Sequence, residues 1–495
     1  MDLSLEKGAV STSPSPSKKR DFMTWKRVQW IAVFLLSLSY LWIWTNDREI
    51  KESGKACEQP SPASLPSNLS RFTDAPWFAV DAAKRLAGAV KIPTMSFDDM
   101  GPIDEDPRWA PFTDMHAYLR ATFPLVHATL NLTVVGGYSL VYTWPGLNTD
   151  LKPLMLTGHL DVVPALTALD RWTYPPFSGT FDDEWIYGRG AGDSKNNVIG
   201  ILTAVEHLIS SSWKPRRTII LAFGQDEEIS GPRGANNIGK HLEERHGKYG
   251  IGMIVDEGGM NLESAYGAEF ALPGIAEKGY LNAQIEVDML GGHSSVPPQH
   301  TSIGILSKIV TAIEDSPVFQ PHLETSSPIW GYLSCVAQHD GVASKKPNMK
   351  KIANKFAQMS VGNRYLLQTS KAATIFNAGI KVFYLSSRRR EVSDPPFIGN
   401  ITVDWTDPHE PSPISPFNIS APAWLIFSRA VQAAFGNTGA AASKNIYRWS
   451  PTRAGTKLNI HTVDEKIKIK THVEGVKFYT ELILQSDALS HVQMD

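Results

Sequence analysis

The chain has 495 residues, of which 42% are hydrophobic and 20% charged, and its formal net charge is −2 at pH 7. These values are ordinary for a globular protein and leave room for two or more domains. The charge balance, with no basic stripe in the body of the chain, predicts no nucleic-acid partner. The two cysteines, Cys57 and Cys335, lie far apart without CxxC spacing. They exclude a cysteine zinc site and a disulfide framework, so any metal must be held by histidines and carboxylates.

The N-terminal residues predict a membrane anchor. Residues 1–27 are polar, contain Ser-Pro repeats and basic residues, and are expected to form a disordered cytosolic tail. The apolar run within residues 28–45 is near the lower limit of about 17 residues for a membrane span, and tryptophans stand at both ends. Basic residues precede the run and no small-residue cleavage site follows it. This favours an uncleaved signal anchor over a cleaved signal peptide or a buried core helix.

The positive-inside rule then places everything after Asn46 across the membrane. That side carries four N-glycosylation tripeptides, each weak alone because such tripeptides also arise by chance. They begin at Asn68, Asn131, Asn400 and Asn418. Residues 46–75 contain many Ser, Pro and Glu residues and are expected to form a stalk. The sequence therefore predicts a single-pass type II membrane glycoprotein.

Apolar runs and helical patterns alternate along residues 76–273, the first part of the predicted main domain. Strands are expected at 139–144, 154–157, 185–187, 218–223 and 251–255, and helices at 81–90, 198–209 and 234–246. Strands that alternate with helices at this spacing predict βαβ units. We therefore expect an α/β fold with a mainly parallel sheet between layers of helices.

A smaller inserted α+β module is predicted at residues 274–390. Residues 280–290 alternate in part, as a half-exposed antiparallel strand does, and residues 302–313 have helical spacing. The main domain is expected to resume at residues 391–495. Its last helix is predicted to open at Thr471–Glu474, which has capping-box form.

Polar side chains follow three of the predicted strands directly. The first strand runs into His159, the next into Glu227 and Glu228, and the last into Asp256. Because the carboxyl ends of parallel strands meet at one edge, where ligands bind in open α/β sheets, these groups are expected to lie together. Asp193, just ahead of a helix, can reach the same edge. Taken one at a time, such residues are turn histidines, caps or solvated acids as often as ligands.

Adjacent carboxylates such as Glu227 and Glu228 normally repel, and a cation is the usual reason to bring several together. Histidine and carboxylate ligands without cysteine suit Zn²⁺, with Mn²⁺ or Co²⁺ as alternatives. Two histidines and three acids, one of them bridging, would hold two ions about 3.5–4 Å apart.

Six motifs in this order resemble the co-catalytic zinc exopeptidases of the aminoacylase and glutamate-carboxypeptidase type. Within that family the chain is most similar to the fungal membrane-anchored carboxypeptidases of the S (Gly-X) type, from about Trp77 to the C-terminus. The motifs are Gly158–Asp161, Gly188–Lys195, Asp226–Glu228, Asp256–Gly259, Gly291–Ser295 and Asn459–Asp464. The resemblance implies a zinc-exopeptidase fold whose inserted module is a lid and dimerisation domain.

The resemblance also implies a ligand set for two zinc ions per subunit. His159 and Asp256 would hold one ion, Glu228 and His461 the other, and Asp193 would bridge both. Three further residues would serve catalysis. Asp161 would orient the His159 imidazole, Glu227 would be the general base, and His293 of the lid would stabilise the oxyanion, in such enzymes often from the partner subunit of a homodimer.

Two stretches depart from the family pattern where such enzymes grip the substrate's carboxylate. The family follows the lid's Gly-Xaa-Lys with Asn and Leu-Pro, whereas Gly379–Lys381 runs into Val382–Arg390, and no strand returning from the lid is recognisable. Relatives also carry Asn-Thr-Asp-Thr and a basic residue, whereas Asn437 and Thr438 meet Gly439–Ser443. Both stretches indicate missing segments.

The resulting expectation is a di-zinc metallocarboxypeptidase that removes C-terminal residues from small peptides, in the vacuole membrane or the secretory-pathway lumen. One alternative is hydrolysis or synthesis of N-acyl amino acids, because the same site accepts either acyl group. Another is a catalytically impaired metal-binding glycoprotein, which the departures near Val382 and Gly439 favour.

Overall fold

The computed structural model describes residues 59–258, 261–265, 268–291, 295, 298–339, 348–378, 399–415, 420–436, 438–440, 446–489 and 494. All of them belong to one compact unit, residues 53–495. The predicted cytosolic tail and signal anchor lie outside the described residues, as does the first part of the stalk. Within the described ranges, no helix has the length and apolar character needed to cross a membrane.

A six-stranded mixed sheet forms the centre of the main domain, in the order β1-β2-β5-β3-β6-β12. The four strands from β5 to β12 are parallel, as predicted, whereas the β1–β2 hairpin adds an antiparallel edge. The strands are β1 (Asn131–Val135), β2 (Ser139–Trp144), β3 (Leu154–His159), β5 (Ile219–Gly224), β6 (Met253–Asp256) and β12 (Ile446–Arg448). Four of the five predicted strands are therefore neighbours in one sheet, with β3 between β5 and β6, whereas the strand predicted at 185–187 lies in another sheet.

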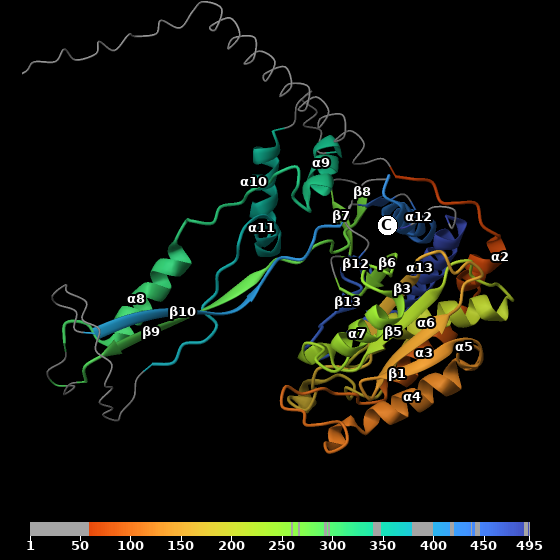
Figure 1. The fold of residues 1–495 in the computed structure, drawn as a ribbon, viewed down its shortest axis with the longest axis horizontal. Coiled ribbons are helices and arrows are strands. Elements are labelled where there is room, and N and C mark those ends of the chain that lie inside the picture. Colours follow the sequence, from red (N-terminus) through yellow and green to blue (C-terminus); the bar gives the residue numbers. More distant parts are fainter. Residues whose placement is uncertain are drawn as a thin grey trace, which may run out of the picture. The chain divides into compact units, whose positions relative to one another are not determined.

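The inner strands β2, β3 and β5 are buried on both faces, which explains why they read as continuous apolar runs. In β5, Leu221 and Phe223 belong to the larger core, together with side chains from six helices. Ile220 and Ala222, pointing the other way, pack with Ile238 of α7 (Ala235–His246). Figure 1 shows the sheet with these helices around it. The helices of the larger core are α3 (Phe78–Val90), α4 (Pro111–Thr122), α5 (Pro124–Thr129), α6 (Lys195–Ser210), α12 (Pro422–Phe435) and α13 (Ile469–Ala488).

The last helix begins earlier than its capping-box sequence predicts. Helix α13 starts at Ile469, and its N-cap residue, Lys468, makes no side-chain capping hydrogen bond. The reason is tertiary: the Ile469 N–H donates to the Glu184 carbonyl oxygen (2.9 Å), which satisfies one of the free amides of the first turn. The predicted start at Thr471 is therefore wrong by one half-turn, because Thr471 is buried inside the helix.

The small module contains the predicted strand β9 (Tyr280–Met289) and helix α8 (Ser302–Asp315). It also contains β10 (Gly399–His409), which pairs antiparallel with β9 along most of its length. This is the returning strand that the sequence did not reveal, and it lies beyond the predicted module boundary at residue 390. Its alternating stretch Ile401–Trp405 carried the signal.

A second set of elements, drawn from stretches before, within and after the small module, has a small core of its own. Phe270 and Leu272 pack there with Leu333 and Phe356. The elements are β7 (Leu262–Ala265), β8 (Ala268–Ala271), α9 (Trp330–His339), α10 (Met349–Met359), α11 (Val361–Leu367) and β11 (Thr438–Ala440). The remaining strands, β4 (Trp185–Tyr187), β13 (Lys457–Leu458) and β14 (Lys466–Lys468), form a three-stranded sheet beside the site described below. Short helical turns are α2 (Ser67–Ser70), η1 (Arg71–Asp74), η2 (Pro107–Trp109), η3 (Leu169–Arg171) and η4 (Glu227–Ile229).

Candidate active site

The carboxyl ends of three parallel neighbours bring the predicted site residues to one edge. His159 is the last residue of β3, and Glu227 and Glu228 stand in the turn η4 just after β5. Asp193 lies two residues before the start of α6 and reaches the same place. His461 comes from the segment between β13 and β14. The structure brings His159, Glu227 and Glu228 together at the ends of their strands, and Asp193 and His461 lie with them.

The buried His159 imidazole has a carboxylate on each side. Its Nδ1 faces the Asp161 carboxylate (Oδ1 at 3.2 Å) and the Asp161 carbonyl (2.9 Å). Its Nε2 faces Asp193 Oδ1 (3.3 Å) and Glu257 Oε1 (3.1 Å). Asp161 therefore lies where a group that fixes the ring orientation must lie, and Nε2 is left for a ligand.

Asp161 also fixes the turn that follows β5. Its two carboxylate oxygens accept the backbone N–H groups of Glu227 (3.0 Å) and Glu228 (3.1 Å). One oxygen further accepts the Ser96 hydroxyl (2.6 Å). The fully buried Asp161 side chain thus fixes the orientation of the His159 ring and the backbone positions of Glu227 and Glu228.

His461 faces the opposite side of Asp193. Its Nε2 lies 3.3 Å from Asp193 Oδ2 and 3.1 Å from Glu228 Oε2. Because Asp193 Oδ1 faces His159, the two oxygens of one carboxylate are directed at two histidines. His461 has a left-handed backbone (φ 59°), which only a tightly held turn imposes on a non-glycine residue. Asp193 thus has the geometry of a bridging ligand.

The structure does not place Asp256 beside His159 as expected. The Asp256 carboxylate accepts the Thr157 hydroxyl, which lies on the adjacent strand β3. The acid that faces His159 is instead the next residue, Glu257. Successive side chains of a strand point to opposite faces, so only one of two adjacent acids can face a given group. A sequence signal existed: the Asp-Glu pair offers two candidates, and strand alternation separates them.

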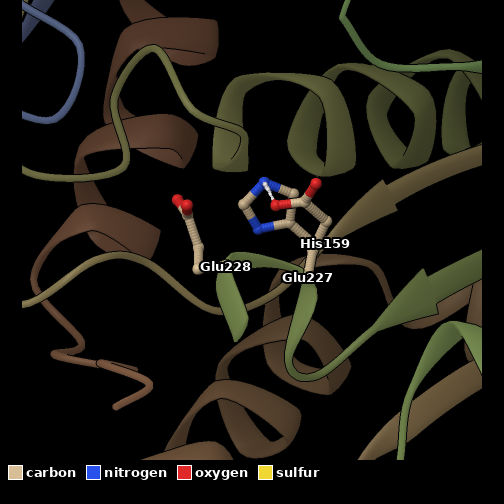
Figure 2. Close-up of side chains that lie close together, drawn as sticks. All are labelled: His159, Glu227 and Glu228. Atoms are coloured by element: carbon tan, nitrogen blue, oxygen red, sulfur yellow. Dashed lines mark ion pairs between the residues drawn. The ribbon is translucent and has the colours of Figure 1, made fainter. Parts of the chain in front are cut away.

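The two adjacent glutamates differ in exposure. Figure 2 shows the Glu227 carboxylate against the His159 ring and the Glu228 carboxylate to one side of it. The Glu227 side chain is 48% exposed, and its Oε2 lies 3.8 Å from His159 Nε2. The Glu228 side chain is only 5% exposed and contacts His461. The exposed Glu227 carboxylate can reach water, as a general base must. The buried Glu228 carboxylate suits a metal ligand.

The cluster perturbs the ionisation of its members. Burial, and then the charge of Asp193, raise the pKa of Glu228 to about 8. The contact with Asp193 raises the pKa of His461 to about 9. Burial also raises the pKa of Glu227. Burial opposes ionisation of Asp193, but hydrogen bonds from His159 and His461 outweigh it and lower the pKa of Asp193. The converging acids therefore need positive charge, as a proton or as a cation.

The donor set fits divalent metal ions. Three overlapping groups have ligand atoms within 4.8 Å of one another: His159 with Glu227 and Glu228, His159 with Asp193 and Glu257, and Asp193 with Glu228 and His461. In addition, Glu228 Oε1 is buried without a hydrogen-bond partner among the described residues. A carboxylate oxygen buried in this way is costly unless it meets a cation. His293, the predicted oxyanion group, lies outside the described residues.

An α/β sheet with histidines and carboxylates converging at the carboxyl edge of its parallel strands defines a candidate dinuclear metal centre. Residues 155–485 match the sequence pattern of peptidase family M20/M25/M40. The chain belongs to this peptidase family and is a metallopeptidase.

The relatives and the fold agree with this assignment. Carboxypeptidase S of Saccharomyces cerevisiae is 32% identical over 511 residues, covering 86% of this chain and 88% of the relative. An N-fatty-acyl-amino acid synthase/hydrolase of Homo sapiens is 31% identical over 478 residues, covering 87% of this chain and 91% of the relative. Among solved structures, the family's metallo-carboxypeptidase from Sulfolobus solfataricus superposes with a TM-score of 0.51 at 16% identity, covering 82% of this chain and 99% of the other.

Proposed function

We propose that the protein is a two-metal carboxypeptidase that hydrolyses the C-terminal peptide bond of small peptides. The observation that carries this proposal is the Asp193 carboxylate, whose two oxygens face His159 and His461. A second carboxylate accompanies each histidine, Glu257 on one side and Glu228 on the other. Sequence similarity to a carboxypeptidase over most of the chain supports the reaction type.

The distances between the side chains divide these residues between two ions. His159 and Glu257 would hold one, His461 and Glu228 the other, and Asp193 both. The nitrogen and oxygen donors without cysteine suit Zn²⁺. When bound, two such ions would polarise the scissile carbonyl and lower the pKa of a water molecule.

The chain's own residues move the proton. Glu227 is exposed to the site and held at its backbone by Asp161, so it can take a proton from water and return it to the leaving amine. Its raised pKa brings this carboxyl closer to the value a general base needs near neutral pH. The lid histidine, His293, remains the proposed oxyanion group, and a homodimer through the lid remains a proposal with it.

Substitution should separate the two adjacent acids after β6. We expect Glu257→Gln to weaken binding of one metal ion by about 10²-fold or more, because it removes the charged carboxylate that would bind the ion beside His159. Asp256→Asn keeps the hydrogen-bond partner of Thr157 and should change metal affinity far less. Metal titration of the metal-free variants measures both. The reverse order would return the ligand role to Asp256.

The substrate class has one serious alternative, hydrolysis or synthesis of N-acyl amino acids, because the human relative bears that name. Both reactions cleave or form an amide next to a free carboxylate. Assays of the part of the chain after Asn46 with a Gly-Leu dipeptide and with an N-fatty-acyl amino acid separate the two. We expect faster turnover of the dipeptide. Turnover of neither substrate, with metal bound, would favour the catalytically impaired alternative.

We further propose that the body of the protein faces the secretory lumen or the vacuole, behind a type II membrane anchor. The sequence from Lys26 to residue 45 supports the anchor. Asn131 is exposed at the start of β1, where a glycan can be attached. Cys335 is disulfide-bonded, and disulfides persist in oxidising compartments. This single bond was not expected from a chain with two distant cysteines.

Treatment with an endoglycosidase tests the orientation. The membrane-bound protein should run at a lower mass after digestion, because at least the exposed tripeptide at Asn131 would carry a glycan in the lumen. Asn131→Gln should abolish part of that shift and serves as the control. A protein whose mass is unchanged by digestion, and which is cut by protease added to the cytosolic side, would contradict the topology.

A further inference from the structure

A fully buried carboxylate, Glu465, ties together the two segments that carry Asp193 and His461. It stands four residues after His461 and directly before β14. Strand β14 pairs with β4, with Lys466 opposite Tyr187, which brings Glu465 against the loop that follows β4. The Glu465 carbonyl accepts the Gly188 N–H (2.9 Å).

The Glu465 side chain holds the backbone of that loop. Its Oε1 accepts the N–H groups of Gly190 (3.1 Å), Gly192 (2.9 Å) and Asp193 (3.2 Å). Its Oε2 accepts Nη1 of Arg189 (2.6 Å), which is itself buried. Charge-assisted hydrogen bonds of this kind are shorter and stronger than neutral ones. The last of the three amides belongs to the residue whose side chain faces both histidines.

The loop and the His461 segment also fit without space to spare. A Cβ on Gly192 would lie 2.6 Å from Cδ1 of Ile460, the neighbour of His461. Gly190 has a φ of +88°, which side-chain-bearing residues rarely adopt. A shift of the loop is therefore opposed by contacts on one side and by hydrogen bonds to Glu465 on the other.

We propose that Glu465 is a positioning residue for the metal centre: it sets the Asp193 backbone relative to His461, so that one carboxylate can serve two ions. This inference rests on the proposed metal centre. The competing explanation is that Glu465 only neutralises Arg189 in the core. The two explanations differ in what they predict for metal affinity as distinct from stability.

Glu465→Gln is the informative substitution. An amide oxygen can accept the backbone N–H groups, but its NH₂ group then meets Arg189, so the side chain cannot satisfy both partners. We expect the dissociation constant for Zn²⁺, titrated into metal-free protein against a chromophoric chelator, to rise about 10–100-fold. Bound Co²⁺ should show an altered visible absorption spectrum.

Two variants serve as matched controls. Glu206→Gln changes another glutamate that accepts two backbone amides, those of Leu125 and Val126, but away from the cluster, and should leave Zn²⁺ affinity unchanged. Arg189→Met removes the guanidinium and keeps the three amide hydrogen bonds. It should lower the melting temperature because a buried carboxylate loses its partner, while Zn²⁺ affinity stays close to that of the unchanged protein.

The outcomes are distinct. Unchanged Zn²⁺ affinity in Glu465→Gln, or equal losses of affinity in Glu465→Gln and Arg189→Met, would overturn the positioning role. If Glu465→Gln does not fold, the double variant Arg189→Met with Glu465→Leu removes both buried charges and the acceptor of the three amides. Zn²⁺ affinity there equal to that of Arg189→Met alone would overturn the role as well. Failure of the unchanged protein to bind Zn²⁺ or Co²⁺ would instead refute the proposed metal centre.

Discussion

Replacing Glu227 by glutamine is expected to lower turnover of a dipeptide about 10²–10⁴-fold while leaving metal content unchanged. The amide keeps the shape of the side chain but cannot take a proton, and general acid–base catalysis has about that worth. Metal should remain because the backbone N–H of Glu227, which the amide variant keeps, still donates to Asp161. Metal analysis of the purified variant, beside steady-state kinetics, measures both quantities.

Glu228→Gln is the control, because the buried Glu228 side chain contacts His461 and one of its oxygens has no hydrogen-bond partner in the described part of the chain. That variant should lose metal and activity together. Loss of metal from Glu227→Gln with retention in Glu228→Gln would show that the two adjacent glutamates have the opposite roles. The difference in exposure between them argues against that exchange.

Sequence reasoning worked best where buried strands end in polar residues. Strands β3 and β5 are apolar on both faces, so their positions and their parallel pairing were predictable, and with them the meeting of His159, Glu227 and Glu228. Predicting the positions of those residues requires no knowledge of loop conformation, because the sheet itself places them. His461 needed the family resemblance, since it comes from a loop whose path is set by tertiary contacts, whereas Asp193 was placed by its position just ahead of a helix.

The failures have a common physical cause. Asp256 remains the predicted ligand, but Glu257 is the acid that faces His159, because the face of a side chain at the end of a strand depends on register, which the sequence of one strand does not contain. Glu465 was missed because its partners are backbone amides of a loop more than 270 residues away. The start of α13 shifted because Glu184, far along the chain, satisfies its first amide. In each case a long-range contact overrode the local pattern.

The strand β10 that returns from the small module is present, but the chain lacks segments that a relative has. The alignment with carboxypeptidase S of Saccharomyces cerevisiae runs over 511 residues although it covers only 86% of this 495-residue chain, so the relative has segments without a counterpart here. Within the described residues, the lid sheet consists of β9 and β10 alone. Helix α8, which packs on it, buries no side chain fully.

A lid built in this way should hold a substrate loosely. Apolar side chains of the two strands, among them Leu281, Val403 and Trp405, are exposed. Among the described residues neither strand pairs with a further strand, which leaves ladder hydrogen-bonding groups without a partner in this sheet. Few buried contacts mean low local stability, and remote binding interactions are what hold the scissile bond in place during reaction.

We therefore expect the chain to be a poor peptidase with an intact metal centre, and expect insertion of the relative's segments to raise its activity. The insertions belong after Lys381 and near Asn437, where the sequence departs from the family pattern. Because a misplacement of about 1 Å in a bound substrate can reduce rate about 10²-fold, kcat and KM on a Gly-Leu dipeptide should both improve, and kcat/KM by at least about that factor. Metal content should stay the same, and Glu227→Gln in the extended protein should remain inactive, which shows that the gained activity belongs to this site. Equal kcat/KM for the chain as it stands and for the extended protein would mean that the two departures leave the grip on the substrate's carboxylate intact.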